Sequence, residues 1–238
     1  MTQASNQKNR DKEDHRIRVA RQKRERMRSR LLDATLEVYH TGDHSRAAVI
    51  DDVVRQAGVS RGTFYKYFES LEDAVEALGA TLADESLCHY KQMFSNLGDP
   101  GVRSAGGAVL PLARAAMEPR WASFTSRVDL IHYLSPEDPL HTVVFTTLQE
   151  ARQAGLFDFD SLYAATDMLT GALLAGMRRL SHGEQRTRTY VTALAGHCMI
   201  GLGMPRGKAT NAVEDAWRRI EAHAADMPWW HSLEEKDE

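Results

Sequence analysis

Cysteine is scarce in this chain of 238 residues, where Cys88 and Cys198 lie far apart and neither belongs to a CxxC pair. This scarcity excludes a disulfide framework and a cysteine-based zinc cluster, and it fits a reducing cytosol. Long apolar runs are also missing, because the longest weakly polar stretch, residues 192–204, is too short to cross about 30 Å of hydrocarbon. We therefore expect a cytoplasmic protein that does not interact with a membrane.

Enzyme motifs are absent from the sequence as well. No GxSxG, HExxH, P-loop or GxGxxG pattern occurs. The ten histidines are scattered, and His40 and His44 flank a Gly-Asp pair instead of sharing a helical face as metal ligands would. We expect no catalytic residues, no metal site and no cofactor.

The charged residues are unevenly distributed along the chain. Residues 1–30 hold eleven basic and four acidic side chains, so this segment carries a net charge of +7 and the rest of the chain carries −10. A positive segment on an acidic body suggests a polyanionic partner, because neutralised phosphates release counterions. A solvated, disordered tail has the same composition, and charge alone does not separate the two.

The stretch "QAGVSRGTFYKYF", residues 56–68, crowds four aromatic side chains around one lysine just after a glycine. Apolar positions before it predict a short helix that ends at Gly58, and Ser60 offers an N-cap for the next helix. Two helices joined by such a turn form a helix-turn-helix, whose second helix enters the major groove of DNA. This motif would explain the crowding.

A rotation of about 100° per residue divides the second helix into two faces. Phe64 lies on the face expected to be buried, and Phe68 closes the unit. On the other face, Arg61 can pair with a guanine, Tyr65 can contact a thymine methyl and Lys66 can neutralise phosphate. A small helical bundle with a surface aromatic cluster is the alternative, and it fits poorly with exposed tyrosine and lysine around a helical glycine. The expected DNA-binding set is Ser60, Arg61, Gly62, Thr63, Tyr65, Lys66 and Tyr67.

Hydrophobic periodicity is helical along the whole chain, with no sustained strict alternation. We predict an all-α protein with a basic flexible arm over 1–23, an N-terminal three-helix helix-turn-helix DNA-binding domain over 24–70 and a C-terminal helical domain over 71–238. The last begins with a connecting fourth helix over 71–95. Glycine and proline separate six further helices, expected at 102–117, 120–134, 139–154, 161–180, 187–202 and 211–224.

The string "DDVVRQAGVSRGTFYKYFESLEDAVEAL", residues 51–78, resembles the DNA-binding motif of TetR-family transcriptional regulators. The likeness covers residues 27–82 and is most specific over 57–68. It implies a homodimer that binds a palindromic double-stranded DNA operator through two recognition helices. It also implies a C-terminal domain for dimerisation and for binding a small-molecule effector, and usually repression.

Two positions depart from the family pattern. Ala48 and Val49 stand where the family commonly has a Thr or Ser cap that also meets phosphate, and Leu71 replaces a common lysine. Basic residues upstream could restore the lost phosphate contacts, as an arm in the minor groove or as a helical extension along the backbone. The candidates are Arg21, Lys23, Arg24 and Arg28.

A dimer needs a surface of fixed geometry, and stripes of small residues in helices 161–180 and 187–202 are the candidates. The resemblance supports this choice, since the last two bundle helices of the family pair with their copies. The alternative is that the two helices form an intramolecular core pair. The expected interface is Ala165, Met168, Ala172, Gly176, Leu194, His197 and Gly201.

Aromatic residues of the middle helices, with a few polar neighbours, have the composition of a ligand pocket. A Trp or Phe at helical spacing is more often part of an ordinary core. The expected pocket residues are Trp121, Phe124, Arg127, Tyr133, Phe145 and Met168.

The functional hypothesis is a repressor that a small effector releases from its operator. A constitutive architectural or cell-division-linked DNA-binding protein on the same fold, without an effector, is the alternative. An apolar cavity of several hundred Å³ would favour the regulator, and a fully packed body would favour the alternative.

Overall fold

The computed structural model describes residues 2–42, 46–128 and 139–233, with side chains from residue 18 onward. All regular structure in these residues is helical, which confirms the all-α prediction. The chain forms two compact units, residues 1–78 and 79–238. Their boundary lies inside α4 (Leu71–Phe94), whereas we expected it at residue 70. The first turns of α4 belong to the first unit, where Leu71, Ala74 and Leu78 are buried.

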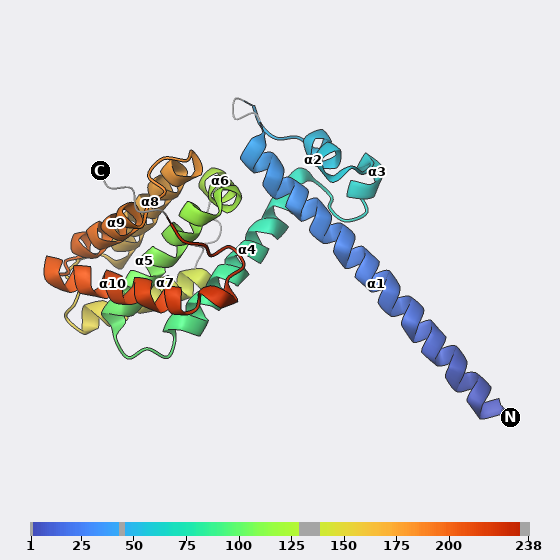
Figure 1. Ribbon diagram of the computed structural model, residues 1–238, viewed down its shortest axis with the longest axis horizontal. Coiled ribbons are helices and arrows are strands. Elements are labelled where there is room, and N and C mark those ends of the chain that lie inside the picture. The colour runs from blue at the N-terminus through green and yellow to red at the C-terminus, as the bar shows by residue number, and fades with distance from the viewer. Residues whose placement is uncertain (1, 43–45, 129–138, 234–238) are drawn as a thin grey trace. The chain divides into compact units, whose positions relative to one another are not determined.

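The first unit contains α1 (Thr2–Thr41), α2 (Ile50–Ala57) and α3 (Arg61–Phe64), followed by the start of α4. Leu31, Val53 and Phe64 are completely buried in its core. Figure 1 shows α2 and α3 beside the carboxyl-terminal half of α1, while the other half of α1 extends beyond them.

The amino-terminal segment differs from our expectation of a flexible arm over residues 1–23. The backbone of residues 2–23 continues α1 as a helix. Residues 2–41 contain no glycine or proline and are rich in Arg, Lys, Gln, Glu and Ala, all strong helix formers. Local propensity therefore favours extending the helix through the basic segment.

Helix α3 is shorter than expected. It ends at Phe64, and a turn continues to Tyr67 through hydrogen bonds from Lys66 N–H to the Thr63 carbonyl and from Tyr67 N–H to the Phe64 carbonyl. Gly58 ends α2 with a φ of 62°, a left-handed conformation that glycine adopts without strain.

The second unit contains six helices besides the remainder of α4 in the part of the chain that the structure describes. Their bounds follow the expected ranges, except that α10 begins five residues earlier, directly after Pro205. The expected helix over 120–134 is observed to Arg127, and residues 129–138 lie outside the described part. The helices are α5 (Pro100–Met117), α6 (Pro119–Arg127), α7 (Pro139–Gln153), α8 (Leu162–Ser181), α9 (Arg188–Gly201) and α10 (Arg206–Ala222).

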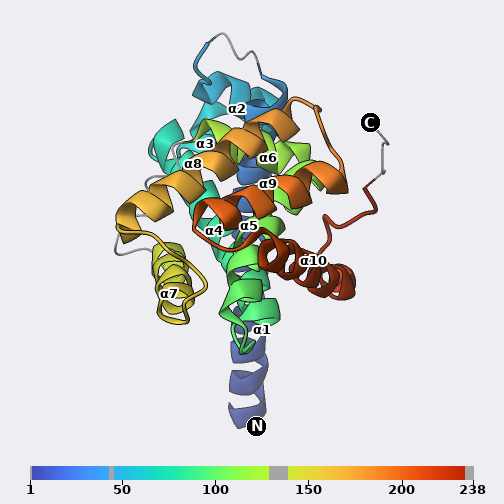
Figure 2. The same ribbon diagram turned by 90° about the vertical axis from the view of Figure 1, so that its left-hand side faces the viewer.

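Helix α5 is the centre of the second unit and contacts α6, α7, α8, α9 and α10. Ala105, Ala108 and Ala113 are completely buried in it, and such small side chains let neighbouring helices approach closely. Figure 2 shows α8 and α9 side by side in this unit. Among the described residues, no helix combines the length and apolarity needed to span a bilayer.

Candidate functional site

The polar face of α3 is exposed, as the sequence predicted. Tyr65 keeps 51% of its surface accessible, and Arg61, Gly62 and Lys66 are exposed beside it. The opposite face is anchored, because Phe64 and Phe68 are buried with their ring centroids 5.7 Å apart. The structure thus brings the expected contact residues to one surface.

The three hydroxyl residues of the expected set lie at the edges of this surface. Ser60 is exposed, whereas Thr63 and Tyr67 are half-buried. The Ser60 side chain accepts a hydrogen bond from the Thr63 N–H at 3.1 Å, as an N-cap does, and its Oγ lies 3.0 Å from Thr63 Oγ1. These two hydroxyls are therefore engaged in starting α3.

Gly62 leaves open space on the exposed face. A Cβ built there would meet only Ser60 Oγ, at 3.9 Å. Packing within the described residues therefore does not require a glycine at this position. Its smallness is useful only if something outside the chain approaches the backbone.

Two aspartates in the first turn of α2 hold arginines. Asp51 Oδ1 lies 3.4 Å from Nε of Arg61, with both side chains more than half exposed. Asp52 takes a bidentate pair from Arg46 at 2.8 Å for both contacts and accepts the Val49 N–H at 3.2 Å. The Arg46 hydrogen bonds lower the pKa of Asp52 to about 2. This carboxylate makes the N3 half of a capping box, while Val49 at the N-cap supplies no side-chain acceptor.

The basic residues of α1 divide into two groups. Arg28 lies over the ring of Phe68 at 5.4 Å, so it is held against the helix-turn-helix. Arg21, Lys23 and Arg24 are exposed farther along the helix, and Arg21 makes an exposed contact of 3.7 Å with Glu25. The first unit thus presents the α3 surface together with a cationic helix.

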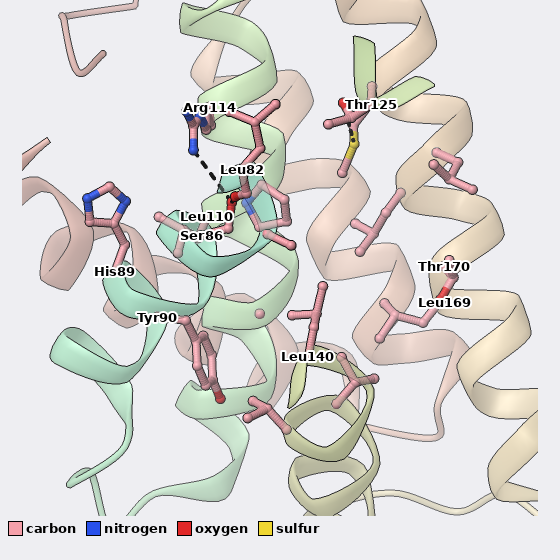
Figure 3. A pocket seen from close by; sticks show the side chains of 18 of the residues that line it. Leu82, Ser86, His89, Tyr90, Leu110, Arg114, Thr125, Leu140, Leu169 and Thr170 are labelled. Atoms are coloured by element: carbon pink, nitrogen blue, oxygen red, sulfur yellow. Dashed lines mark hydrogen bonds between the residues drawn. The ribbon is translucent and has the colours of Figure 1, made fainter. Parts of the chain in front are cut away.

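The second unit contains a partly open cavity of about 180 Å³. Its walls are predominantly apolar and come from α4, α5, α6, α7 and α8, with Trp229 from the segment after α10. Figure 3 shows Leu82, Ser86 and Tyr90 of α4 on one side and Leu140 and Leu169 on others. Apolar walls with a few polar groups are typical of small-molecule sites.

The model of the family "Bacterial regulatory proteins, tetR family" matches residues 31–78. The amino-terminal module is that of the tetR family. The match ends at the residue where the first compact unit ends. No curated protein matches this sequence.

Solved structures share the fold of this chain at low sequence identity. RolR in complex with resorcinol is 21% identical, with a TM-score of 0.55 over 81% of this chain and 95% of that one. FadR from Bacillus subtilis in complex with stearoyl-CoA is 18% identical, with a TM-score of 0.56 over 73% and 96%. A gamma-butyrolactone receptor described as ArpA-like is 17% identical, with a TM-score of 0.52 over 83% and 98%.

Two of the expected pocket residues, Trp121 and Phe124, line the cavity. Arg127 and Phe145 do not line the cavity. Arg127 is in the last turn of α6, and the ring centroids of Phe145 and His141 are 4.0 Å apart. Met168 is 41% exposed and also lies outside the cavity lining. Tyr133 lies outside the described residues.

The sequence analysis missed the α4 and α5 walls of the cavity. We interpreted residues 71–95 only as a connection, although Leu82, Ser86 and Tyr90 face the cavity. Arg114 was the available signal, because a lone arginine near Pro111 interrupts an otherwise apolar stretch of α5.

Arg114 is the buried cation of the cavity, with 5% of its side chain accessible. Its Nη2 lies 2.9 Å from Glu85 Oε2, its Nε lies 2.8 Å from Glu118 Oε2, and its Nη1 lies 3.5 Å from Ser86 Oγ. The guanidinium also lies 5.0 Å from the Trp121 ring centroid. A buried charge needs such compensation, since desolvation is costly.

The small-residue stripes of α8 and α9 are divided between the core and the surface. Ala165 and Gly176 are buried, and a Cβ at Gly176 would lie 2.4 Å from Leu194 Cδ2. The intramolecular alternative therefore accounts for these three residues of the expected dimer interface. Met168, His197 and Gly201 are exposed, and Ala172 is half-buried.

Proposed function

We propose that the protein is a sequence-specific DNA-binding transcriptional regulator that acts as a cytoplasmic homodimer on a palindromic operator. The observation that supports this most is the exposed face of α3 inside a tetR-family module. Arg61, Tyr65 and Lys66 offer the donors and the ring that read base edges and phosphates in a major groove. The open space at Gly62 would let the backbone approach the duplex.

The cationic part of α1 would add phosphate contacts. Arg21, Lys23 and Arg24 are exposed on a continuous helix, which favours a helical extension along the DNA backbone over an extended arm in the minor groove. Such contacts carry no sequence information but raise affinity and its dependence on salt.

An effector-released repressor is the form of regulation that the second unit supports best. The cavity of about 180 Å³ exceeds the roughly 150 Å³ that holds benzene, yet it is below the roughly 300–1,000 Å³ of drug-sized pockets. It would admit a compact molecule such as the resorcinol bound by RolR and would not enclose a ligand as large as the stearoyl-CoA bound by FadR. A body with such a cavity fits the regulator better than a constitutive architectural protein.

Helix α4 would connect ligand binding to DNA binding. Its first turns belong to the DNA-binding unit, whereas Leu82, Ser86 and Tyr90 of the same helix line the cavity. A ligand that prefers one position of α4 would shift the spacing of two recognition helices in a dimer. The exposed face of α8 and α9, with Met168, His197 and Gly201, is the surface we propose for dimerisation.

Replacing Tyr65 by alanine tests the proposed DNA-binding surface. Selection from a random double-stranded library would first define the preferred sequence, and mobility-shift titrations would then compare variants. Tyr65→Ala should weaken specific binding by about five- to a hundredfold, since a base contact contributes roughly 1–3 kcal/mol. Arg206→Ala removes an exposed side chain from α10, outside both proposed surfaces, and should leave binding unchanged. Unchanged specific binding by Tyr65→Ala would contradict the proposal.

A further inference from the structure

Two tryptophans of the cavity lining carry buried indole N–H groups that no group in the described part of the chain satisfies. Nε1 of Trp121 and Nε1 of Trp229 are both inaccessible and both lack a hydrogen-bond partner there. Both indole rings lie close to Arg114. Its guanidinium is 5.0 Å from the Trp121 ring centroid and 5.6 Å from the Trp229 ring centroid. An indole N–H is a donor only, so each requires an acceptor.

Leaving such donors unsatisfied costs free energy that a ligand acceptor would recover. Trp121 is 4% exposed overall, so bulk water does not reach it freely. Trp229 comes from the segment after α10 and packs edge-on against His89, with ring centroids 6.1 Å apart. The two unsatisfied N–H groups, of Trp121 and Trp229, therefore belong to the part of the cavity lining that surrounds Arg114.

The charge at this end of the cavity is already neutralised. Glu85 and Glu118 each hold one edge of the Arg114 guanidinium, so two carboxylates face one cation. Arg103, the other cation of the lining, is paired with Glu150. An anion entering the cavity would therefore find no uncompensated positive charge and would lose its hydration.

His89 does not supply a positive charge either. Burial is the largest influence on its imidazole and lowers the pKa, against the raising effect of Glu85; the Arg114 charge lowers the pKa further, and Asp226 raises it least. The ring is therefore neutral at neutral pH. Its Nδ1 is buried without a hydrogen-bond partner in the described residues, so it offers one further neutral polar contact.

We propose that the effector is a compact neutral molecule, about the size of one substituted ring, whose oxygen accepts hydrogen bonds from the indole N–H groups of Trp121 and Trp229. The apolar remainder of the ligand fills the space between α4, α5, α7 and α8. Carboxylates of the same size are excluded. This inference rests on the proposed regulatory function, because it names the ligand class of the same cavity.

Three probes of similar size separate the contributions of shape, acceptor and charge. Acetophenone has a neutral carbonyl, ethylbenzene lacks an acceptor and benzoate carries a charge. Calorimetric titration of the full-length protein should give an affinity for acetophenone about five- to a hundredfold above that for ethylbenzene, as two hydrogen bonds contribute. Benzoate should bind more weakly than both.

Tryptophan-to-phenylalanine variants test the two donors while keeping an aromatic ring. Trp121→Phe and Trp229→Phe should each reduce the preference for acetophenone over ethylbenzene and leave ethylbenzene affinity nearly unchanged. Trp217→Phe is the matched control, because Trp217 is a buried tryptophan of α10 that does not line the cavity. Circular dichroism melting checks that each variant folds.

A charge variant tests why anions are excluded. Glu85→Gln removes one of the two carboxylates that neutralise Arg114, so benzoate affinity should rise severalfold while acetophenone affinity changes little. Benzoate binding as tightly as acetophenone in the unmodified protein would overturn the proposal. It would also be overturned if no probe binds, or if both tryptophan variants keep the full preference for acetophenone.

Measuring operator binding separately distinguishes this inference from the proposed function. If acetophenone binds with the expected selectivity but operator affinity is unchanged, the ligand class stands and the effector role fails. If the protein binds its operator while the probes fail, the regulator stands and the ligand class fails.

Discussion

The two units present their functional groups in opposite ways. In residues 1–78, Arg61, Tyr65 and Lys66 come from one short segment and are exposed. In residues 79–238, the polar groups of the cavity come from separate segments and are buried, with Arg114 paired to two carboxylates. An exposed surface keeps its polar groups hydrated until a partner arrives, whereas a buried site must satisfy them in advance.

This difference determines how each unit tolerates change. A surface residue of α3 can be replaced with little effect on folding, so its loss reports on binding alone. A cavity residue contributes to the packing of five helices as well as to the ligand site. Variants that change either folding stability or binding affinity, but not both, therefore test this difference between the two units most directly.

Phe64→Ala should have the largest effect on stability. Phe64 is completely buried beneath the exposed face of α3, so its truncation should lower the free energy of unfolding of the first unit by about 3–5 kcal/mol. Chemical denaturation followed by circular dichroism measures this loss. Tyr65→Ala, one residue away and half exposed, should change stability by under about 1 kcal/mol. Equal losses in the two variants would show that α3 does not divide into a buried and an exposed face.

Two glycine-to-alanine substitutions should act in opposite directions. A Cβ at Gly106 would lie 2.4 Å from the Phe94 ring, so Gly106→Ala should destabilise the second unit by about 1–3 kcal/mol. Gly62 has open space, so Gly62→Ala should stabilise the protein by up to about 1 kcal/mol. The same Gly62 variant should bind operator about tenfold more weakly. Undiminished binding would show that the backbone at Gly62 does not approach the duplex.

Removing three cations from α1 tests whether this helix contacts DNA. Replacing Arg21, Lys23 and Arg24 by glutamine should lower the slope of log affinity against log salt by up to about 2.7, at an unchanged preferred sequence. Affinity titrations at several salt concentrations provide the slope. Replacing Arg206, Lys208 and Arg218 of α10 gives the control, for which we expect the original slope.

Asp52→Asn should produce a small, pH-dependent change in stability. The pKa of Asp52 is lowered in the fold from 3.8 to about 2, so its contribution is present above pH 4 and disappears as the pH falls toward 2. The variant should melt at a lower temperature at pH 7, and the difference should vanish near pH 2. Arg46→Gln removes the same ion pair from the other side and should reproduce this pattern. A difference that is constant with pH would exclude the charged cap.

Sequence patterns predicted the structure correctly where it depends on residues close together in the chain. The exposed and buried faces of residues 60–68, the end of α2 at Gly58 and the proline and glycine breaks depend on residues a few positions apart. The capping role of Asp52 was not predicted from the sequence. The basic segment was expected as a flexible arm, because its charge drew more weight than its uninterrupted helix propensity.

Contacts between segments that are distant in the sequence could be identified only from the tertiary structure. Gly176 and Leu194 seemed to belong to a dimer surface until their mutual packing was visible, and Phe145 has the composition of a pocket residue but stacks on His141. Trp121 and Trp229 are more than one hundred positions apart in the sequence, yet both contact Arg114. Helical periodicity specifies which face of a helix is apolar, but it does not specify which other helix covers that face. The cavity and its neutralised charge depend on which helices cover one another's apolar faces.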